Sequence, residues 1–136
     1  MPLITSIKGR ILYNSRGSQT IEIDIISDNQ HMGRVCSPSG TSVGKYEAQS
    51  FPQNKPEKSL EILKKNAKKF VGLDSSNLKE IHETLREIDS TPNYSKVGGS
   101  LAFALTIASM ESASKSLEIP MFKLLSKNSI FSNARR

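Results

Sequence analysis

The hydrophobic period changes once along this chain, and that change constrains the fold more than any single motif. Ile21, Ile23 and Ile25 alternate with Glu22 and Asp24, which is the period of a strand with one buried face. In the second half, apolar residues recur at three- and four-residue spacing, as on the buried face of a helix. Strands followed by helices, without alternation between the two, predict an α+β fold: a small antiparallel sheet packed against a helical bundle.

Two further strands are expected beside the isoleucine-rich one. Residues 4–13 are rich in apolar and β-branched side chains, and residues 31–36 continue after a short turn at Asp28-Asn29. The turn-forming cluster 14–18 separates the first strand from the second. Because parallel pairing needs a long crossover, these short links predict a three-stranded antiparallel meander.

The helices are expected after residue 55. The first two have their apolar faces at Leu60, Leu63, Ala67 and Phe70/Val71, and at Leu78, Ile81, Leu85 and Ile88. The segment 74–76 offers N-cap residues for the second. A third helix, 101–117, is apolar or small all round in its first half and should be the buried central helix. A short fourth helix is expected from Pro120 to Leu125.

Length and composition predict one domain over residues 1–125, followed by a loose tail at 126–136. The chain has 136 residues, of which 36% are hydrophobic, and a single cysteine, which leaves no internal disulfide framework. No apolar run approaches the length of a membrane span. The first residues lack the layout of a signal peptide. We therefore expect a cytoplasmic protein with no membrane partner.

The net charge of +6 raises the question of a nucleic-acid partner, since basic surfaces attract polyanions. Six lysines crowd one segment: Lys55, Lys58, Lys64, Lys65, Lys68 and Lys69. No aromatic residue is interleaved with them as a base-stacking platform would need. We interpret the lysines as a solvated helix face, and nucleic acid is not a favoured partner.

Few residues suggest catalysis. His82 lies between apolar positions of a helix and is expected at the surface, while nothing near His31 suggests a triad. Cys36, in a strand, is expected to be a small core residue. Glu80, Glu83, Glu87, Lys79 and Arg86 have the spacing of solvated surface pairs on a helix.

The segment from Ser37 to Ala48 is rich in glycine and hydroxyl residues. It is not a P-loop, because Ser39 stands where that motif needs glycine and Tyr46 where it needs serine or threonine. Its backbone and hydroxyl oxygens are nevertheless suited to a hard cation such as Mg²⁺, and its amides to an anion. From residue types alone, a functional loop and a plain connection both remain open.

This segment resembles the Pro-Ser-Gly-Ala-Ser-Thr-Gly-x-Tyr/His-Glu-Ala signature of enolase (phosphopyruvate hydratase). The matched positions are Pro38, Ser39, Gly40, Ser42, Gly44, Tyr46, Glu47 and Ala48. Further matches in the family's order are Gly9-Arg10, Ser15-Arg16-Gly17 with Thr20 and Glu22, Ser95-Lys96-Val97-Gly98, and Ile119-Pro120-Met121-Phe122. The resemblance extends along almost the whole chain, but only to the N-terminal domain of an enolase.

The resemblance implies a lyase of glycolysis and gluconeogenesis that interconverts 2-phosphoglycerate and phosphoenolpyruvate. In that family the general base, the general acid and the carboxylates of the first Mg²⁺ belong to a larger α/β barrel, so no catalytic residue is expected in this chain. The N-terminal domain supplies a mobile loop that closes over the substrate. The matching loop positions here are Ser39, Gly40, Thr41 and Gly44.

By the same resemblance, Ser42 would bind the second Mg²⁺. Enolases are usually homodimers, and Arg10, Arg16 and Glu22 match positions at or near the subunit contact. The expected partners are therefore an enolase barrel, in the same chain or a separate one, and a second subunit. Without the barrel this chain is expected to be inactive.

Departures from the family pattern leave other readings open. Thr41 replaces alanine and Val43 replaces threonine in the loop, although Ser42 and the glycines are kept. A degenerate relative, or a free-standing non-catalytic binding module that uses the lysine-rich helix, is the alternative. The capping domain of another member of the barrel superfamily fits the loop less well.

Overall fold

The computed structural model describes residues 2–13, 15, 17, 19–37, 51–52, 55–91, 94 and 96–127. Within these ranges a three-stranded sheet precedes the helices, which confirms the predicted α+β class. The strands are β1 (Ile4–Tyr13), β2 (Gln19–Ser27) and β3 (His31–Cys36). The helices are α1 (Pro56–Asn66), the 3₁₀ turn η2 (Ala67–Lys69), α2 (Leu78–Ile88), α3 (Gly99–Leu117) and α4 (Met121–Lys127).

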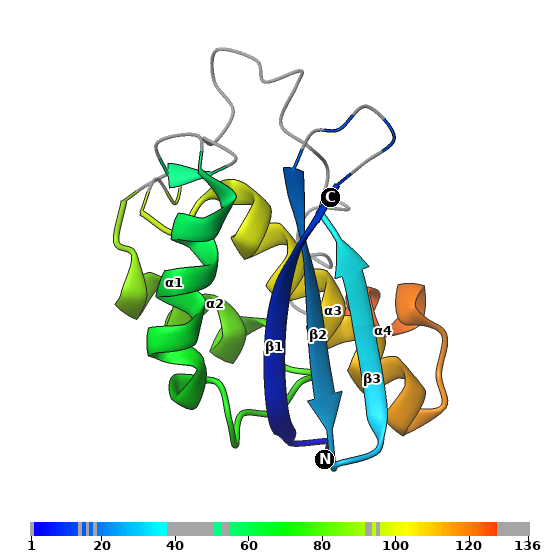
Figure 1. Ribbon diagram of the computed structural model, residues 1–136. Helices are drawn as coiled ribbons and strands as arrows, with labels where there is room; N and C mark the ends of the chain where they lie inside the picture. Colours follow the sequence, from blue (N-terminus) through cyan, green and yellow to red (C-terminus); the bar gives the residue numbers. More distant parts are fainter. Residues whose placement is uncertain are drawn as a thin grey trace.

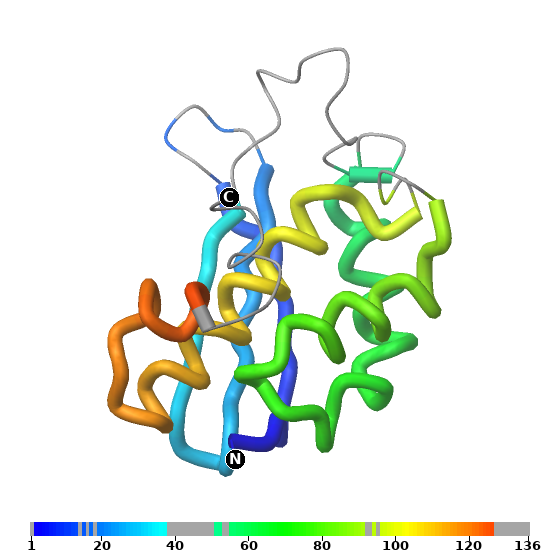
Figure 2. Tube along the Cα trace, turned by 180° about the vertical axis from the view of Figure 1, so that it is seen from behind, coloured from blue at the N-terminus to red at the C-terminus, as the bar shows by residue number. Residues whose placement is uncertain are grey.

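The sheet is the predicted antiparallel meander, in the order β1-β2-β3. Figure 1 shows the sheet in front, with α3 behind it, α1 and α2 beside the β1 edge, and α4 on the β3 side. Figure 2, from behind, shows α3 crossing the covered face of the sheet. The β2–β3 turn uses Asp28 and Asn29 in the left-handed region, with φ of 53° and 57°, a conformation that asparagine and aspartate tolerate better than most residues.

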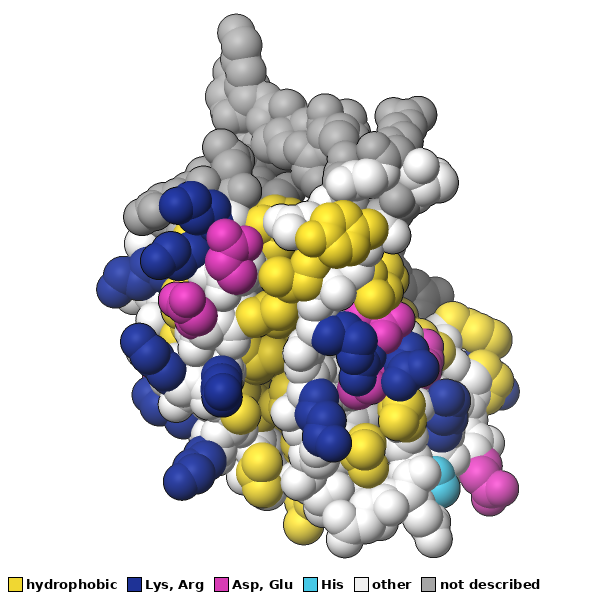
Figure 3. Space-filling view, viewed as in Figure 1, with side chains coloured by type: hydrophobic (Ala, Val, Ile, Leu, Met, Phe, Trp, Pro, Cys, Tyr) yellow, Lys and Arg dark blue, Asp and Glu magenta, His cyan; other side chains and the backbone are white. Residues whose placement is uncertain are grey.

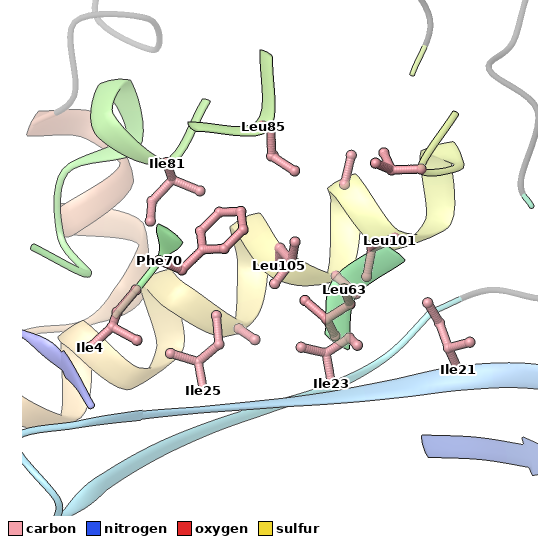
Figure 4. Packing of buried hydrophobic residues seen from close by; sticks show 14 of the residues in the cluster. Ile4, Ile21, Ile23, Ile25, Leu63, Phe70, Ile81, Leu85, Leu101 and Leu105 are labelled. Atoms are coloured by element: carbon pink, nitrogen blue, oxygen red, sulfur yellow. The ribbon is translucent and has the colours of Figure 1, made fainter. Parts of the chain in front are cut away.

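The core lies between the sheet and the helices. Ile21, Ile23 and Ile25 are at most 1% exposed and face buried side chains of the helices, including Leu101 and Leu105 (Figure 4). At about 25 cal/mol per Å², each buried isoleucine side chain contributes roughly 1.5–3 kcal/mol. The period-2 pattern therefore identified the buried face of β2 correctly.

Glycine allows the closest approach between α3 and the sheet. A Cβ on Gly33 would lie 1.9 Å from the carbonyl oxygen of Ala108 and 2.7 Å from the amide nitrogen of Ser112. The backbone of α3 thus rests directly on β3 at this point. The first half of α3 is mostly buried, as predicted, although Phe103 is 49% exposed.

Several local predictions were wrong. Cys36 is exposed, because the register pairs it with Glu22 on the face of the sheet away from the helices. The first helix does not continue to residue 71: it ends at Asn66, and after η2 Phe70 is buried while Val71 is 48% exposed. The N-cap of α2 is Asn77, one residue after the predicted segment, and its side chain accepts a hydrogen bond from the Glu80 amide at 3.2 Å.

His82 is also less exposed than predicted. It is half-buried, and its Nε2 lies 3.4 Å from the hydroxyl of Thr106 on α3. Burial lowers the pKa of the His82 imidazole, and the nearby Arg86 charge lowers it further. A neutral imidazole packed between α2 and α3 fits a structural role.

Candidate functional site

The residues predicted to act on substrate and metal lie outside the described residues. These are Ser39, Gly40, Thr41, Ser42 and Gly44, together with Arg16 of the predicted subunit contact. The structure does describe what holds the two ends of the 38–50 segment, and the predicted contact residues Arg10 and Glu22.

Ser37, at the start of this segment, is fixed to the sheet. It is 3% exposed, its amide donates to the Ile21 carbonyl at 2.9 Å, and its carbonyl accepts a hydrogen bond from the Thr20 hydroxyl. At the far end, Phe51 is 6% exposed and belongs to the main core cluster. Both ends are therefore anchored by buried residues.

A buried carboxylate organises the neighbouring connection between α2 and α3. Asp89 is fully buried and accepts hydrogen bonds from the Thr91 amide at 2.9 Å, the Lys96 amide at 2.7 Å and the Val97 amide at 3.0 Å. The Thr91 hydroxyl also donates to it, at 2.5 Å. Burial by itself raises the pKa of Asp89, but these donors hold that pKa below its usual value.

The same connection is tied to α1. The carbonyl of Val97 accepts a hydrogen bond from the buried Ser59 hydroxyl at 2.6 Å. Since α1 begins shortly after Phe51 and α3 begins just after Val97, the start of both helices is fixed near one end of the sheet (Figure 1). Ser37, which follows β3 at the same end of the sheet, is held there by its hydrogen bond to Ile21.

The sequence reasoning did not find the role of Asp89. Its only local signal was the Asp-x-Thr spacing, which is typical of a side chain that folds back onto the backbone two residues later. The contacts to residues 96 and 97 close a larger loop that the spacing did not predict.

On the open face of the sheet, four charged residues form an ion network. Asp24 lies at its centre, accepting from Arg34 Nε at 2.7 Å, Arg34 Nη2 at 3.0 Å and Arg10 Nη2 at 2.8 Å. Arg10 also pairs with Glu22, and Arg34 Nε lies 3.6 Å from a Glu22 oxygen. The network thus joins all three strands.

The two arginines differ in exposure from the carboxylate that they share. The side chain of Asp24 is 5% exposed, whereas those of Arg10 and Arg34 are 38% and 51% exposed. The guanidinium of Arg34 lowers the pKa of Asp24 to about 2, opposed by burial and helped by Arg10. The network therefore keeps a charged carboxylate under two partly exposed cations, an arrangement that can offer donors to a partner surface.

The family resemblance named Arg10 and Glu22 as subunit-contact positions, without predicting that they pair with each other, and it did not name Asp24 or Arg34. Once the meander is accepted, the register brings Asp24 opposite Arg34 and Glu22 opposite Arg10. The alternation had already put Asp24 on the face opposite the isoleucines. The strand pattern therefore predicted the face on which Asp24 lies, but not its pairing with Arg34.

The described residues provide no ready-made metal centre. Among them, no group of three His, Cys, Asp or Glu side chains could hold a metal ion. Nor does any helix in this part of the chain have the length and apolar character needed to cross a membrane.

A three-stranded meander covered on one face by helices defines a small α+β domain, and its sequence carries a glycine- and hydroxyl-rich segment between the buried residues Ser37 and Phe51. The family model for the N-terminal domain of enolase matches residues 4–125. This chain belongs to that family.

Relatives named enolase agree with this assignment. The enolase of Methanosphaera stadtmanae is 32% identical over 124 residues, covering 90% of this chain. That of Picrophilus torridus is 34% identical over 115 residues, covering 84% of this chain. The enolase of Ehrlichia canis is 32% identical over 131 residues, covering 90%. The chain spans only about 30% of the length of these relatives.

Proposed function

We propose that this chain acts as the N-terminal part of an enolase, the lyase that interconverts 2-phosphoglycerate and phosphoenolpyruvate in glycolysis and gluconeogenesis. The observation that carries this proposal is the family match over residues 4–125, a range that contains the whole of the motif-bearing segment. The relatives that match are full-length enolases, in which this domain is accompanied by a C-terminal domain.

In this proposal the 38–50 segment closes over the substrate. Ser39, Gly40, Thr41 and Gly44 approach the substrate, and the Ser42 hydroxyl would help to hold Mg²⁺. Serine hydroxyl and backbone carbonyl oxygens are hard ligands of the kind that Mg²⁺ accepts. When bound, the ion would stabilise the negative charge that builds up as a proton is removed beside a carboxylate. The anchors at Ser37 and Phe51 support such a motion, because a closing loop needs fixed ends.

The remaining machinery would come from a C-terminal barrel, in the same chain or a separate one. The 136-residue chain alone would then be inactive. The complete protein would act in the cytoplasm. A second subunit would contact Arg10 and Glu22 on the open face of the sheet, and also Arg16. The exposed guanidinium of Arg10, held in place by Glu22 and Asp24, supports this surface as the contact.

The proposal is tested on the native protein, recovered from its source cells. We expect a mass several times 15.0 kDa and Mg²⁺-dependent formation of phosphoenolpyruvate from 2-phosphoglycerate. Replacing Ser42→Ala should lower kcat/KM on the order of 10–100-fold, the usual cost of disturbing a metal site. Ser126→Ala, on the exposed surface of α4, is the matched control and should leave activity unchanged.

Two results would contradict the proposal. A native mass near 15.0 kDa without a separate barrel chain would favour the alternative, a free-standing binding module. Turnover by the pure 136-residue chain would show that no barrel is needed.

A further inference from the structure

One edge of the sheet is left open beside α1. In the described part of the chain, β1 pairs only with β2 from Ser6 to Tyr13, so it is an edge strand. Only its first residue is covered on the outer side, where Ile4 exchanges hydrogen bonds with Leu73 (2.9 Å) and Gly72 (2.8 Å). Beyond that point no described residue pairs with the edge, an arrangement that natural proteins usually avoid.

The register shows which backbone groups face this edge. The carbonyl of Ile21 accepts from Ser37, beyond β3, so Ile21 and every second residue of β2 are directed at β3. Glu22 and Asp24 are then directed at β1, where they pair with Arg10 and Lys8.

Because backbone groups alternate between the two sides of a strand, the amides and carbonyls of Ile7, Gly9 and Ile11 are directed away from β2. Among the described residues these groups have no hydrogen-bond partner, so they form a ladder of available donors and acceptors along the edge.

A groove runs along the same edge. It has a volume of about 540 Å³ and is lined by Ile7, Lys8, Gly9 and Arg10 of β1 and by Leu60, Leu63, Lys64 and Ala67 of the α1 side. Figure 3 shows the hydrophobic strip between the lysines of α1 and strand β1.

Because Gly9 has no side chain, the backbone of β1 is accessible from the groove at this position. A Cβ at this position would come within 2.7 Å of Leu60 and 3.1 Å of Leu63. Without a side chain, Gly9 itself is exposed, and the apolar side chains of α1 form the floor beside the strand. Ile7 and Ile11 also stay half-exposed, whereas their neighbours on β2 are fully buried.

The rim of the groove is positively charged. Lys8, Arg10 and Lys64 line it, and no carboxylate is among the described lining residues. Arg10 is already paired with Glu22 and Asp24, while Lys8 and Lys64 have no ion-pair partner within the described residues. A second copy of β1 would bring the same cations against themselves, so charge excludes it as the natural occupant.

We propose that this groove binds an extended acidic segment of another protein, which adds as a fourth strand to β1. Backbone hydrogen bonds to Ile7, Gly9 and Ile11 would give affinity, and strand addition of this kind is a common mode of peptide recognition. Alternate side chains of the segment would be apolar toward Leu60 and acidic toward Lys8 and Lys64. This proposal goes beyond the enolase reaction and does not depend on it.

The test uses a fluorescein-labelled peptide, Glu-Val-Glu-Ile-Asp-Val-Glu, titrated into the 136-residue chain in about 150 mM salt, where exposed charges are screened beyond about 8 Å. We expect saturable binding, with amide chemical shifts that change at Ile7, Gly9 and Ile11. The double variant Lys8→Glu with Lys64→Glu should weaken binding at least tenfold.

Lys79→Glu with Lys123→Glu is the matched control. It makes the same change in net charge at exposed positions of α2 and α4 and should alter the dissociation constant less than twofold. All four lysines are exposed, so both variants should fold, which a thermal melt verifies.

Backbone pairing is tested separately from charge. Two peptides are N-methylated at alternate amides, one at the odd and one at the even positions. A strand that adds to β1 directs only one set at the protein, so one peptide should bind and the other should not. Equal binding of both, or no binding of the unmodified peptide, would overturn the proposal.

Three other outcomes would also overturn it. Single-stranded RNA of equal charge that binds as tightly would show a general polyanion surface. Concentration-dependent shifts of the same amides without peptide would show a second copy as the occupant. Peptide binding by the 136-residue chain but not by the native protein would show that the native protein covers the groove itself.

Discussion

The two faces of the sheet differ in how the side chains of β2 contribute to stability. On β2, Ile21, Ile23 and Ile25 face the helices and are essentially fully buried, while Glu22 and Asp24 face outward into an ion network. The covered face stabilises the fold through apolar burial. The open face contributes less, because ion pairs with partly exposed arginines typically add about 0–1 kcal/mol each. It leaves the guanidinium groups of Arg10 and Arg34 partly exposed.

The largest expected effect is on the covered face. Replacing Ile23→Ala should lower the free energy of unfolding by about 4 kcal/mol, within the range for deleting a buried isoleucine side chain. Urea denaturation of the 136-residue chain measures it. Ile26→Ala, on the open face of the same strand and half-buried, should cost about 1 kcal/mol or less. Equal losses in the two variants would show that the faces are not energetically different.

On the open face, the largest effect is expected at the centre of the ion network. Asp24→Asn should lower the free energy of unfolding by about 2 kcal/mol, because two guanidinium groups would then face a neutral amide. Chemical denaturation at pH 7 is the measurement. As a control, Glu61→Gln on the exposed side of α1 should change stability by less than about 0.5 kcal/mol. A comparable small change for Asp24→Asn would mean that the network adds nothing.

The contribution of Asp24 should also depend on pH. Its folded pKa is lowered to about 2, below the value of about 3.9 for an unfolded aspartate. The stabilisation is therefore complete above about pH 5 and lost as the pH falls toward 2. Unfolding free energies of the unsubstituted chain and of Asp24→Asn should converge over this window, whereas the deficit of Ile23→Ala should persist. Parallel curves for Asp24→Asn would rule out a lowered pKa.

The smallest effect is expected at Cys36. Because this thiol is exposed on the open face, Cys36→Ser should change stability by less than about 0.5 kcal/mol. In the native 136-residue chain the thiol should react with a disulfide reagent as fast as in the unfolded chain. Reaction only after unfolding would place Cys36 in the core, as the sequence suggested.

The sequence was most informative where a periodic pattern coincided with burial. Ile21, Ile23 and Ile25 identified β2 and its covered face, and Leu78, Ile81 and Leu85 identified α2. It was less informative at Cys36, because a single strand residue has two possible faces and only the register decides between them.

The candidate site was predictable in part. Arg10 and Glu22 were named from a resemblance as positions at the subunit contact, and that role stays a prediction; the structure shows that their side chains form an ion pair. Asp24 and Arg34 were not named, because their meeting depends on pairing between β2 and β3 rather than on any local spacing. Asp89 was missed because two of its donors, the amides of Lys96 and Val97, lie seven and eight residues further along the chain.

By itself, the sequence determined the order of strands and helices, the apolar faces of β2 and α2 and the family, because these depend on local periods and motifs. Only the tertiary structure decided that Asp89 ties the start of α3 to the end of α2, that Asp24 gathers two arginines, and that β1 has an open edge beside α1. Each of these results from contacts between distant residues, and contacts of that kind follow from packing and register rather than from the spacing of residues along the chain.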